Sequence, residues 1–151
     1  MLDTIIPAVY IIILTMLAVL DFKYRIIPNK IIYPALILSL ALSWFGIGMV
    51  SSLIGGAVML AVMLVSLLFR KVMQVGMGDV KLGLLIGLMV GFPLISINML
   101  FIGIAGIMVS VAVMIFKHRK GKDTLPFGTI MSIATILTIL LGGNIWQLLV
   151  R

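Results

Sequence analysis

Six long apolar segments restrict this chain to very few folds. They cover residues 4–20, 31–49, 52–69, 80–92, 94–116 and 129–149. A helix of about 20 residues crosses the roughly 30 Å hydrocarbon core of a bilayer, and in lipid only helices and closed barrels satisfy every backbone polar group. The segments lack the alternation of polar and apolar residues that barrel strands require. The sequence therefore predicts an all-α, polytopic membrane helix bundle with six transmembrane helices.

Composition excludes a water-soluble globule. Hydrophobic residues make up 64% of the chain and charged residues 10%, which leaves too little polar surface to cover a soluble domain of this size. The first segment has neither a basic stretch before it nor a small-residue cleavage pattern after it, so we expect it to be retained. Because there is no break in composition and no internal repeat, residues 1–151 are predicted to form a single transmembrane domain.

Basic residues orient the predicted bundle. Ten of the eleven lysines and arginines fall in three polar loops that lie on one side when six helices alternate in direction: Lys23, Arg25 and Lys30; Arg70, Lys71 and Lys81; Lys117, Arg119, Lys120 and Lys122. Arg151 is alone on the other side, with turns expected near Val50-Ser51 and at Gly91-Phe92-Pro93. An excess of basic residues marks cytoplasmic loops, which places both termini outside the cytoplasm in the cell membrane.

Two of the four acidic residues carry the predicted chemistry. The acids are Asp3, Asp21, Asp79 and Asp123, and there is no glutamate. Asp21 closes the first apolar segment and Asp79 precedes the fourth, so the predicted topology puts both at the cytoplasmic face. Hydrolysis of a peptide bond by two carboxylates needs one to take a proton from water and the other to donate one, and neighbouring carboxylates share a proton in this way. The pair predicts an aspartic protease at the bilayer surface, with the roles of base and acid left open.

Small and turn-forming residues flank both aspartates. Gly76 and Gly78 precede Asp79, and a backbone without Cβ lets a substrate strand come close. Asp79 itself lies near the start of a predicted helix, where the helix macrodipole favours an anion. Pro28 is expected to end the first helix, and Asn29 is expected to cap the second.

Other positions are interpreted as structural. Gly83, Gly87 and Gly91 form a small-residue stripe that allows close packing of the fourth helix. Lys81 is expected to extend towards the membrane interface or to balance Asp79. His118 is expected to be a solvated loop residue, because a single histidine without cysteine or glutamate makes no metal site. We therefore predict no metal and no cofactor.

Simpler interpretations of the two aspartates stay open at this point. Asp79 could be an ordinary helix cap, and Asp21 could be an interfacial acid neutralised by Lys23 or Arg25. The net charge of +7 is explained by short loops against anionic lipid and gives no reason to expect nucleic acid as a partner.

Three short motifs together resemble the type IV prepilin peptidase family of GxGD-type intramembrane aspartic proteases. They are Asp21 with Arg25-Ile26-Ile27-Pro28-Asn29, then Gly76-Met77-Gly78-Asp79-Val80-Lys81-Leu82, then Pro126-Phe127-Gly128. The resemblance implies that Asp21 and Asp79 are catalytic, and that the site is supported by Gly76, Gly78, Lys81, Pro28, Asn29, Pro126, Phe127 and Gly128. It further implies cleavage of the basic leader of prepilin or pilin-like precursors, on the cytoplasmic side, after a glycine and before the precursor's hydrophobic segment.

Two departures from the family pattern refine this expectation. Long bifunctional members carry paired Cys-x-x-Cys motifs, associated with zinc and N-methylation of the mature pilin, whereas this chain has no cysteine. We therefore expect peptidase activity without the methyltransferase, as in the short forms linked to Flp/Tad pili or preflagellin processing. In addition, Thr129 stands where many relatives have proline. The turn formed by Pro126, Phe127 and Gly128 is expected to re-enter the membrane near the active site.

Functions from other classes compete with the peptidase. A small proton-coupled transporter would also use buried acids, but typically near the bilayer midplane and with internal repeats. A presenilin-like protease would pair Gly-x-Gly-Asp with Tyr-Asp and Pro-Ala-Leu, and this chain lacks the Tyr-Asp. A structural subunit would tolerate amides at positions 21 and 79. The sequence leaves open the oligomeric state and the identity of the precursor.

Overall fold

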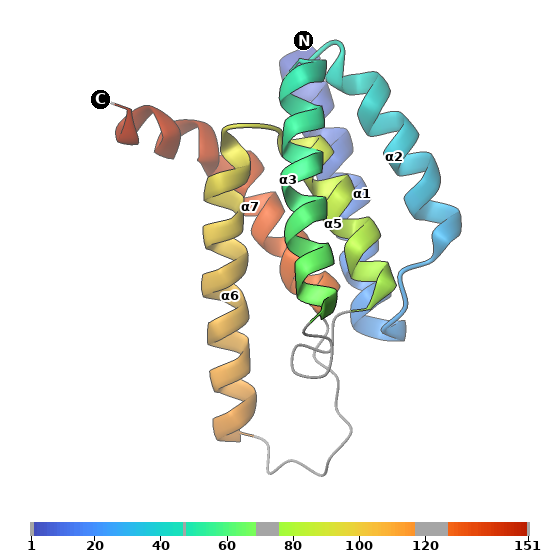
Figure 1. Ribbon diagram of the computed structural model, residues 1–151, viewed down its shortest axis with the longest axis vertical. Coiled ribbons are helices and arrows are strands. Elements are labelled where there is room, and N and C mark those ends of the chain that lie inside the picture. Colours follow the sequence, from blue (N-terminus) through green and yellow to red (C-terminus); the bar gives the residue numbers. More distant parts are fainter. Residues whose placement is uncertain (1, 47, 69–75, 117–126, 151) are drawn as a thin grey trace.

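The computed structural model describes residues 2–46, 48–68, 76–116 and 127–150, and all regular structure in those ranges is helical (Figure 1). The six helices found there are α1 (Leu2–Tyr24), α2 (Asn29–Ser43), α3 (Met49–Leu68), α5 (Met77–Val90), α6 (Leu94–Phe116) and α7 (Phe127–Leu149). Helices α1, α3, α6 and α7 are long and apolar enough to cross a membrane. The predicted all-α bundle is confirmed, with six helices in the described residues. Six membrane crossings, and the side of the membrane that each terminus faces, stay predictions.

Helix α2 ends earlier than the sequence pattern predicts. Its last residue is Ser43, and the chain turns before α3, with Gly48 at φ +87° donating its N–H to the Ser43 carbonyl at 3.0 Å. Glycine adopts this left-handed conformation without the steric cost of a Cβ. The turn expected near Val50-Ser51 is therefore wrong, because both residues lie inside α3. With 15 residues, α2 is about 22 Å long.

Two prolines stand immediately before helices rather than inside them. Pro28 occupies the N-cap position of α2 and Asn29 is the first helical residue, so the expectation that Asn29 caps this helix is wrong. Pro93 likewise precedes α6, which begins at Leu94. A proline has no N–H to leave unpaired at a helix start.

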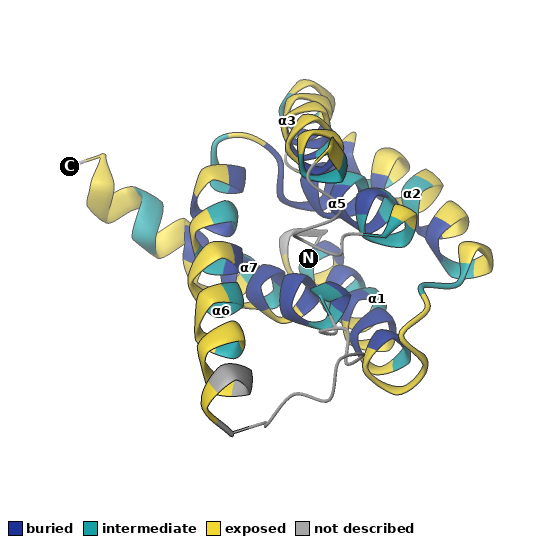
Figure 2. Ribbon diagram, turned by 60° about the horizontal axis from the view of Figure 1, so that its bottom comes forward, coloured by how far each residue is buried: buried dark blue, intermediate teal, exposed yellow. Residues whose placement is uncertain are grey.

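The short helix α5 occupies the centre of the bundle. Leu82, Leu85 and Ile86 are fully buried, and α5 contacts α2, α3 and α7. Figure 2 shows that buried residues cover most of its circumference. A helix that is apolar all round is one that neighbouring helices surround, so the 14 residues of α5 are packed mainly against protein.

Glycines permit a close contact between α3 and α5. A Cβ built on Gly55 would lie 2.5 Å from the carbonyl oxygen of Gly87, and a Cβ on Gly87 would collide with the Gly55 carbonyl in return. Ser52 adds a hydrogen bond from its hydroxyl to the Leu88 carbonyl at 2.5 Å. The predicted packing role is confirmed at Gly87, where only glycine lets the two backbones approach.

Substitution of Gly87 by alanine should destabilise the fold. The new methyl group would meet backbone atoms, which cannot rotate away, and overpacking of this kind costs about 1–3 kcal/mol. Thermal unfolding in detergent measures the effect. Gly103 on α6 is the matched control, because a Cβ there meets nothing within 4 Å. Gly103→Ala should therefore not lower the melting temperature, since alanine favours a helix interior more than glycine does. Equal melting temperatures for the two variants would contradict the packing role.

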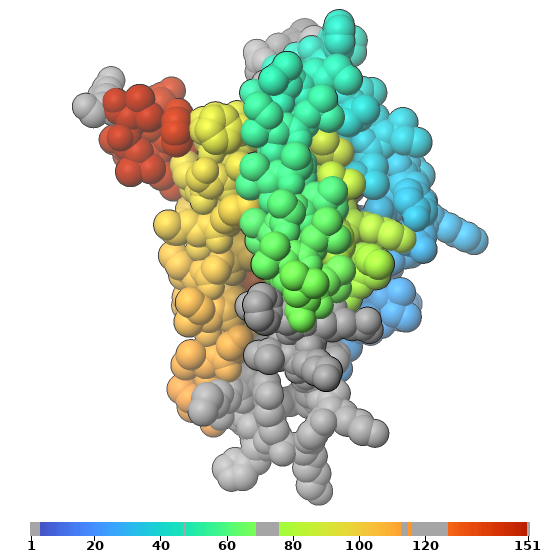
Figure 3. Space-filling view, in the orientation of Figure 1, coloured from blue at the N-terminus to red at the C-terminus, as the bar shows by residue number. Residues whose placement is uncertain are grey.

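The outer surface of the bundle is apolar. Exposed side chains on α3 include Leu53, Leu64 and Val65, and those on α6 include Ile107 and Met108. Both helices are visible on the face shown in Figure 3. In a water-soluble protein such a surface would drive aggregation, whereas in a bilayer it faces lipid.

The segments that carry the three motifs meet at one end of the bundle. Figure 1 shows the C-terminal end of α1 and the N-terminal ends of α5 and α7 at the lower end, opposite the chain's N-terminus, and the chain that leaves α1 rises from there to the start of α2. This arrangement arises because helices that follow one another in the chain run in opposite directions. It brings residues far apart in the chain within reach of one another.

Candidate active site

Asp21 caps the start of another helix. It lies in the last turn of α1 and is 6% exposed, and its Oδ2 accepts the backbone N–H of Thr129 at 2.7 Å. Thr129 is the third residue of α7, where backbone N–H groups have no partner within the helix. An anion is stabilised there by the helix dipole. The interpretation of Asp21 as an acid neutralised by a neighbouring lysine or arginine is thus not needed to explain its burial.

The hydroxyl of Thr129 makes a second contact with the same carboxylate. Its Oγ1 lies 3.0 Å from Asp21 Oδ2 and 3.1 Å from the Ala18 carbonyl oxygen. A hydroxyl has one hydrogen to donate, so it serves one of these acceptors at a time. Together the N–H and the hydroxyl fix the position of Oδ2 at the α7 terminus.

Gly128 leaves room for this carboxylate. A Cβ at position 128 would lie 2.9 Å from both Cγ and Oδ2 of Asp21, closer than carbon approaches these atoms in folded proteins. The third motif therefore contributes a backbone surface on which Asp21 rests, and any larger residue would displace the carboxylate.

Asp79 is placed by the first turn of α5. Its Oδ2 accepts the backbone N–H of Gly76 at 2.9 Å, so its side chain does cap the helix, as the simpler interpretation predicts. It precedes the apolar stretch that begins at Val80 and is half-buried. Burial raises the pKa of the Asp79 carboxyl; the Gly76 N–H acts in the opposite direction, and the charge of Asp21 raises it further. The two aspartates are thus close enough to influence each other.

Ile27 lies between the second and third motifs. A Cβ on Gly78 would be 3.4 Å from the Ile27 Cβ, and a Cβ on Gly128 would be 3.1 Å from the Ile27 Cδ1. Ile27 follows Asp21 in the turn between α1 and α2. This one side chain therefore joins the turns that carry Asp21, Asp79 and Thr129.

Lys81 connects α5 to α2 rather than neutralising Asp79. Its Nζ donates to Asn29 Oδ1 at 2.8 Å and to the Tyr33 hydroxyl at 3.0 Å, and it lies 5.0 Å from the centre of the Tyr33 ring. The lysine of the second motif thus binds the asparagine of the first. These bonds hold the two helix starts together, and the structural role expected for Lys81 takes this form.

The remaining expected support residues have simpler environments. Pro28 sets the extended backbone before α2 (φ −70°, ψ 125°), and Phe127 packs half-buried against the core. Pro126 lies outside the described residues. Thr129 and Ile27 were not among the expected site residues, although both stand next to or within the motifs. No three histidine, cysteine, aspartate or glutamate side chains gather around a common point in the part of the chain that the structure describes.

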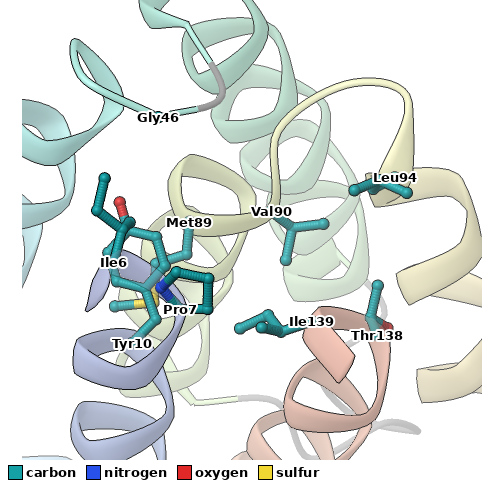
Figure 4. Close-up of a pocket in the computed structure, with 9 residues that line it drawn as sticks. All are labelled: Ile6, Pro7, Tyr10, Gly46, Met89, Val90, Leu94, Thr138 and Ile139. Carbon is teal, nitrogen blue, oxygen red and sulfur yellow. The ribbon is translucent and has the colours of Figure 1, made fainter. Parts of the chain in front are cut away.

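A separate cavity of about 300 Å³ lies near the other end of the bundle (Figure 4). Ile6 and Tyr10 of α1, Met89 of α5 and Ile139 of α7 are among its lining residues. Ile6 is 15 residues before Asp21 on the same helix, or about 22 Å along the axis. None of the described residues that line this cavity is acidic, and the cavity is remote from Asp21.

Comparison with known proteins identifies relatives by sequence. The model of the type IV leader peptidase family matches residues 8–115, which include Asp21 and Asp79. A prepilin leader peptidase/N-methyltransferase of Pseudomonas putida is 28% identical over 136 residues, which are 86% of this chain and 47% of that protein. Proteins of the same description from Stutzerimonas stutzeri and Pseudomonas aeruginosa are each 25% identical over 135 residues, or 85% of this chain.

The chain spans about half the length of these curated relatives, since the aligned part is 47% of each. No solved structure matches the chain.

Proposed function

The chain belongs to the type IV leader peptidase family, and on that basis we propose that it is an aspartic endopeptidase that removes the leader of prepilin or pilin-like precursors. Flp/Tad-type pilins and preflagellin-like proteins are the precursors for which we propose it. The observation that supports the proposal most is that Gly78, next to Asp79, and Gly128, which lies against Asp21, both approach Ile27 at one end of the bundle, where the charge of Asp21 raises the pKa of Asp79.

The proposed reaction uses the two carboxyl groups in complementary protonation states. The ionised carboxylate takes a proton from water, and the water oxygen adds to the carbonyl carbon of the scissile peptide bond. The protonated carboxyl donates its proton to the carbonyl oxygen. The carbon–nitrogen bond then breaks, the leaving amine takes up a proton, and the products are the free leader and the mature precursor. The roles of the two aspartates within this scheme stay open.

We propose that the reaction takes place at the cytoplasmic face of the cell membrane. Lys23, Arg25, Lys30 and Lys81 belong to the helix ends around the aspartate pair, and basic residues concentrate on the cytoplasmic side of membrane proteins. Anionic lipid headgroups are the proposed partners of this charge.

We propose leader cleavage without N-methyl transfer for this chain. The relatives' descriptions include both activities, but the sequence has no cysteine, and the methyltransferase insert of long family members is associated with paired cysteines.

Cleavage of a pilin-like precursor by the purified protein tests the proposed function. In detergent or lipid, we expect a single cut between the basic leader and the precursor's apolar segment, located by mass spectrometry of both products. A folded protein that leaves the precursor intact, and that instead moves protons across a vesicle membrane, would replace the peptidase with the transporter.

Thr129 supplies a milder prediction about this activity. Thr129→Val keeps the size of the side chain and the backbone N–H but removes the hydroxyl that contacts Asp21 Oδ2, so kcat should fall about three- to tenfold. Thr129→Ser keeps the hydroxyl and should retain nearly full activity. Kinetics of the two variants at equal thermal stability decide the matter, and a valine variant as active as the serine variant would rule out a role for the hydroxyl.

A further inference from the structure

A second hollow lies beside Asp21, on the outer face of α1 and α7. It has a volume of about 600 Å³, within the range of sites that hold organic ligands. We call it the α1/α7 groove. Its apolar walls are formed by Ala18, Val19 and Phe22 of α1, and by Ile133 and Ile136 of α7.

The groove opens away from the protein core. Phe22 is 71% exposed, Val19 58% and Ile133 51%, so these side chains face the surroundings of the bundle. Because α1 and α7 are both long and apolar enough to span a membrane, the groove is open sideways to the bilayer. Molecules that lie in the membrane can therefore enter it without passing through water.

One residue separates the groove from Asp21. Thr129 lines the groove, and its backbone N–H donates to Asp21 Oδ2 at 2.7 Å. Ala18, which also lines the groove, has its carbonyl 3.1 Å from the Thr129 hydroxyl. The groove and the candidate active site thus share a wall.

The direction of the groove matches the order of parts in a leader-bearing precursor. Phe22 of α1 and Thr129 of α7 line the end of the groove that lies at the level of Asp21. Thr15, seven residues before Phe22, and Ile136, seven residues after Thr129, line its other end. Seven residues correspond to about 10 Å of helix. A helical ligand placed there would have one end at the carboxylate and the rest of its length inside the bilayer.

We propose that the α1/α7 groove binds the apolar segment that follows the cleavage site of the precursor. This inference rests on the proposed function. The small side chains of Ala18 and Thr129 allow a second helix to approach closely, and a helix seated there places the peptide bond at its membrane-edge end next to Asp21. A lipid would match the groove through its apolar chain and, at Lys23, through an anionic headgroup, whereas the precursor segment also matches the position of the groove beside the carboxylate.

Disulfide crosslinking tests the location directly, because the chain has no cysteine of its own. Ile133→Cys places a thiol in the groove. Leu64→Cys on α3, which is 48% exposed against 51% for Ile133, is the matched control outside it. The precursor carries one cysteine in the first turns of its apolar segment. We expect Ile133→Cys to give at least tenfold more crosslinked adduct than Leu64→Cys, when adducts of the uncut precursor and of its mature form are counted together.

Each other result of the crosslinking overturns the inference. Equal adducts at positions 133 and 64 would mean that the precursor contacts the bundle without preference, as lipid does. Ile133→Cys dimers that form equally with and without precursor, in place of the adduct, would identify a second copy of the chain as the occupant. If the unsubstituted protein cuts no precursor at all, the proposed function fails first, whereas cutting without preferential crosslinking refutes the groove alone.

Kinetics supply a second, independent readout. Ile133→Trp fills the groove, and we expect KM to rise about tenfold with kcat nearly unchanged, which is the signature of lost binding rather than lost chemistry. Leu64→Trp should leave both constants unchanged. A tryptophan variant at position 133 that folds and shows an unchanged KM would contradict the proposal.

Discussion

Replacement of either Asp21 or Asp79 by asparagine should lower the rate of precursor cleavage by about 10²–10⁴-fold, the range that a general acid or base contributes to catalysis. An amide can neither accept a proton from water nor donate one as an acid. Because the two carboxyls act together, the double variant should cleave the precursor no more slowly than the slower of the two single variants. Single-turnover cleavage with excess enzyme measures the effect.

Folding of these variants is expected to be nearly normal, which makes the kinetic result interpretable. An asparagine at position 21 can still accept the Thr129 N–H through its side-chain oxygen, and one at position 79 can still accept the Gly76 N–H. Asp3→Asn, near the other end of α1, is the control, since the same chemical change there should leave the rate unaltered. Full activity in either the Asp21→Asn or the Asp79→Asn variant would exclude the aspartic protease mechanism.

The structure also shows why the structural and functional interpretations of the aspartates are compatible. Asp79 caps its own helix through Gly76, and Asp21 caps α7 through Thr129. In each case the carboxylate is held by backbone N–H groups that helix starts leave unpaired. Capping fixes these side chains in place, and a fixed carboxylate is what a preorganised site requires.

Apolar segments predicted the helices well because membrane helices are defined by hydropathy. The expected segment 94–116 coincides with α6, and α3 and α7 begin within three residues of their expected starts. The error at α2 arose because residues 44–48 are apolar apart from their glycines, so hydropathy continued through a turn. That helix is followed by a turn at residues 44–46, with no change in polarity to mark its end.

The candidate site was predictable only where a motif names the residue. Asp21 and Asp79 stand in motifs, and the count of predicted helices placed both at one end. Thr129 was regarded only as a departure from the family pattern, yet it contacts Asp21, 108 residues away in the chain. Ile27 was noted only as part of a motif. Contacts across such distances depend on how α1 and α7 pack, which no local pattern of residues specifies.

The α7 start offers the sharpest test of this arrangement. Gly128→Ala should reduce kcat about 10²-fold, because a Cβ there would lie 2.9 Å from Cγ and Oδ2 of Asp21, and displacement of a catalytic group by about 1 Å costs that much. The clash is with the end of a side chain, which can rotate aside. We therefore expect the loss in activity to come with little loss of thermal stability, in contrast to Gly87→Ala, where the new methyl group meets backbone.

Gly78→Ala is the matched control for this prediction. It is the same substitution, in the first turn of α5, but its Cβ would lie 3.4 Å from the Ile27 Cβ, which is ordinary van der Waals contact. The alanine variant at position 78 should therefore keep kcat within a few-fold of the unsubstituted protein. Equal losses at positions 78 and 128 would mean that glycine matters at both for backbone freedom, and not for the space that it leaves to the Asp21 carboxylate. A loss confined to position 128, at unchanged stability, would locate the reacting carboxylate against the first turn of α7.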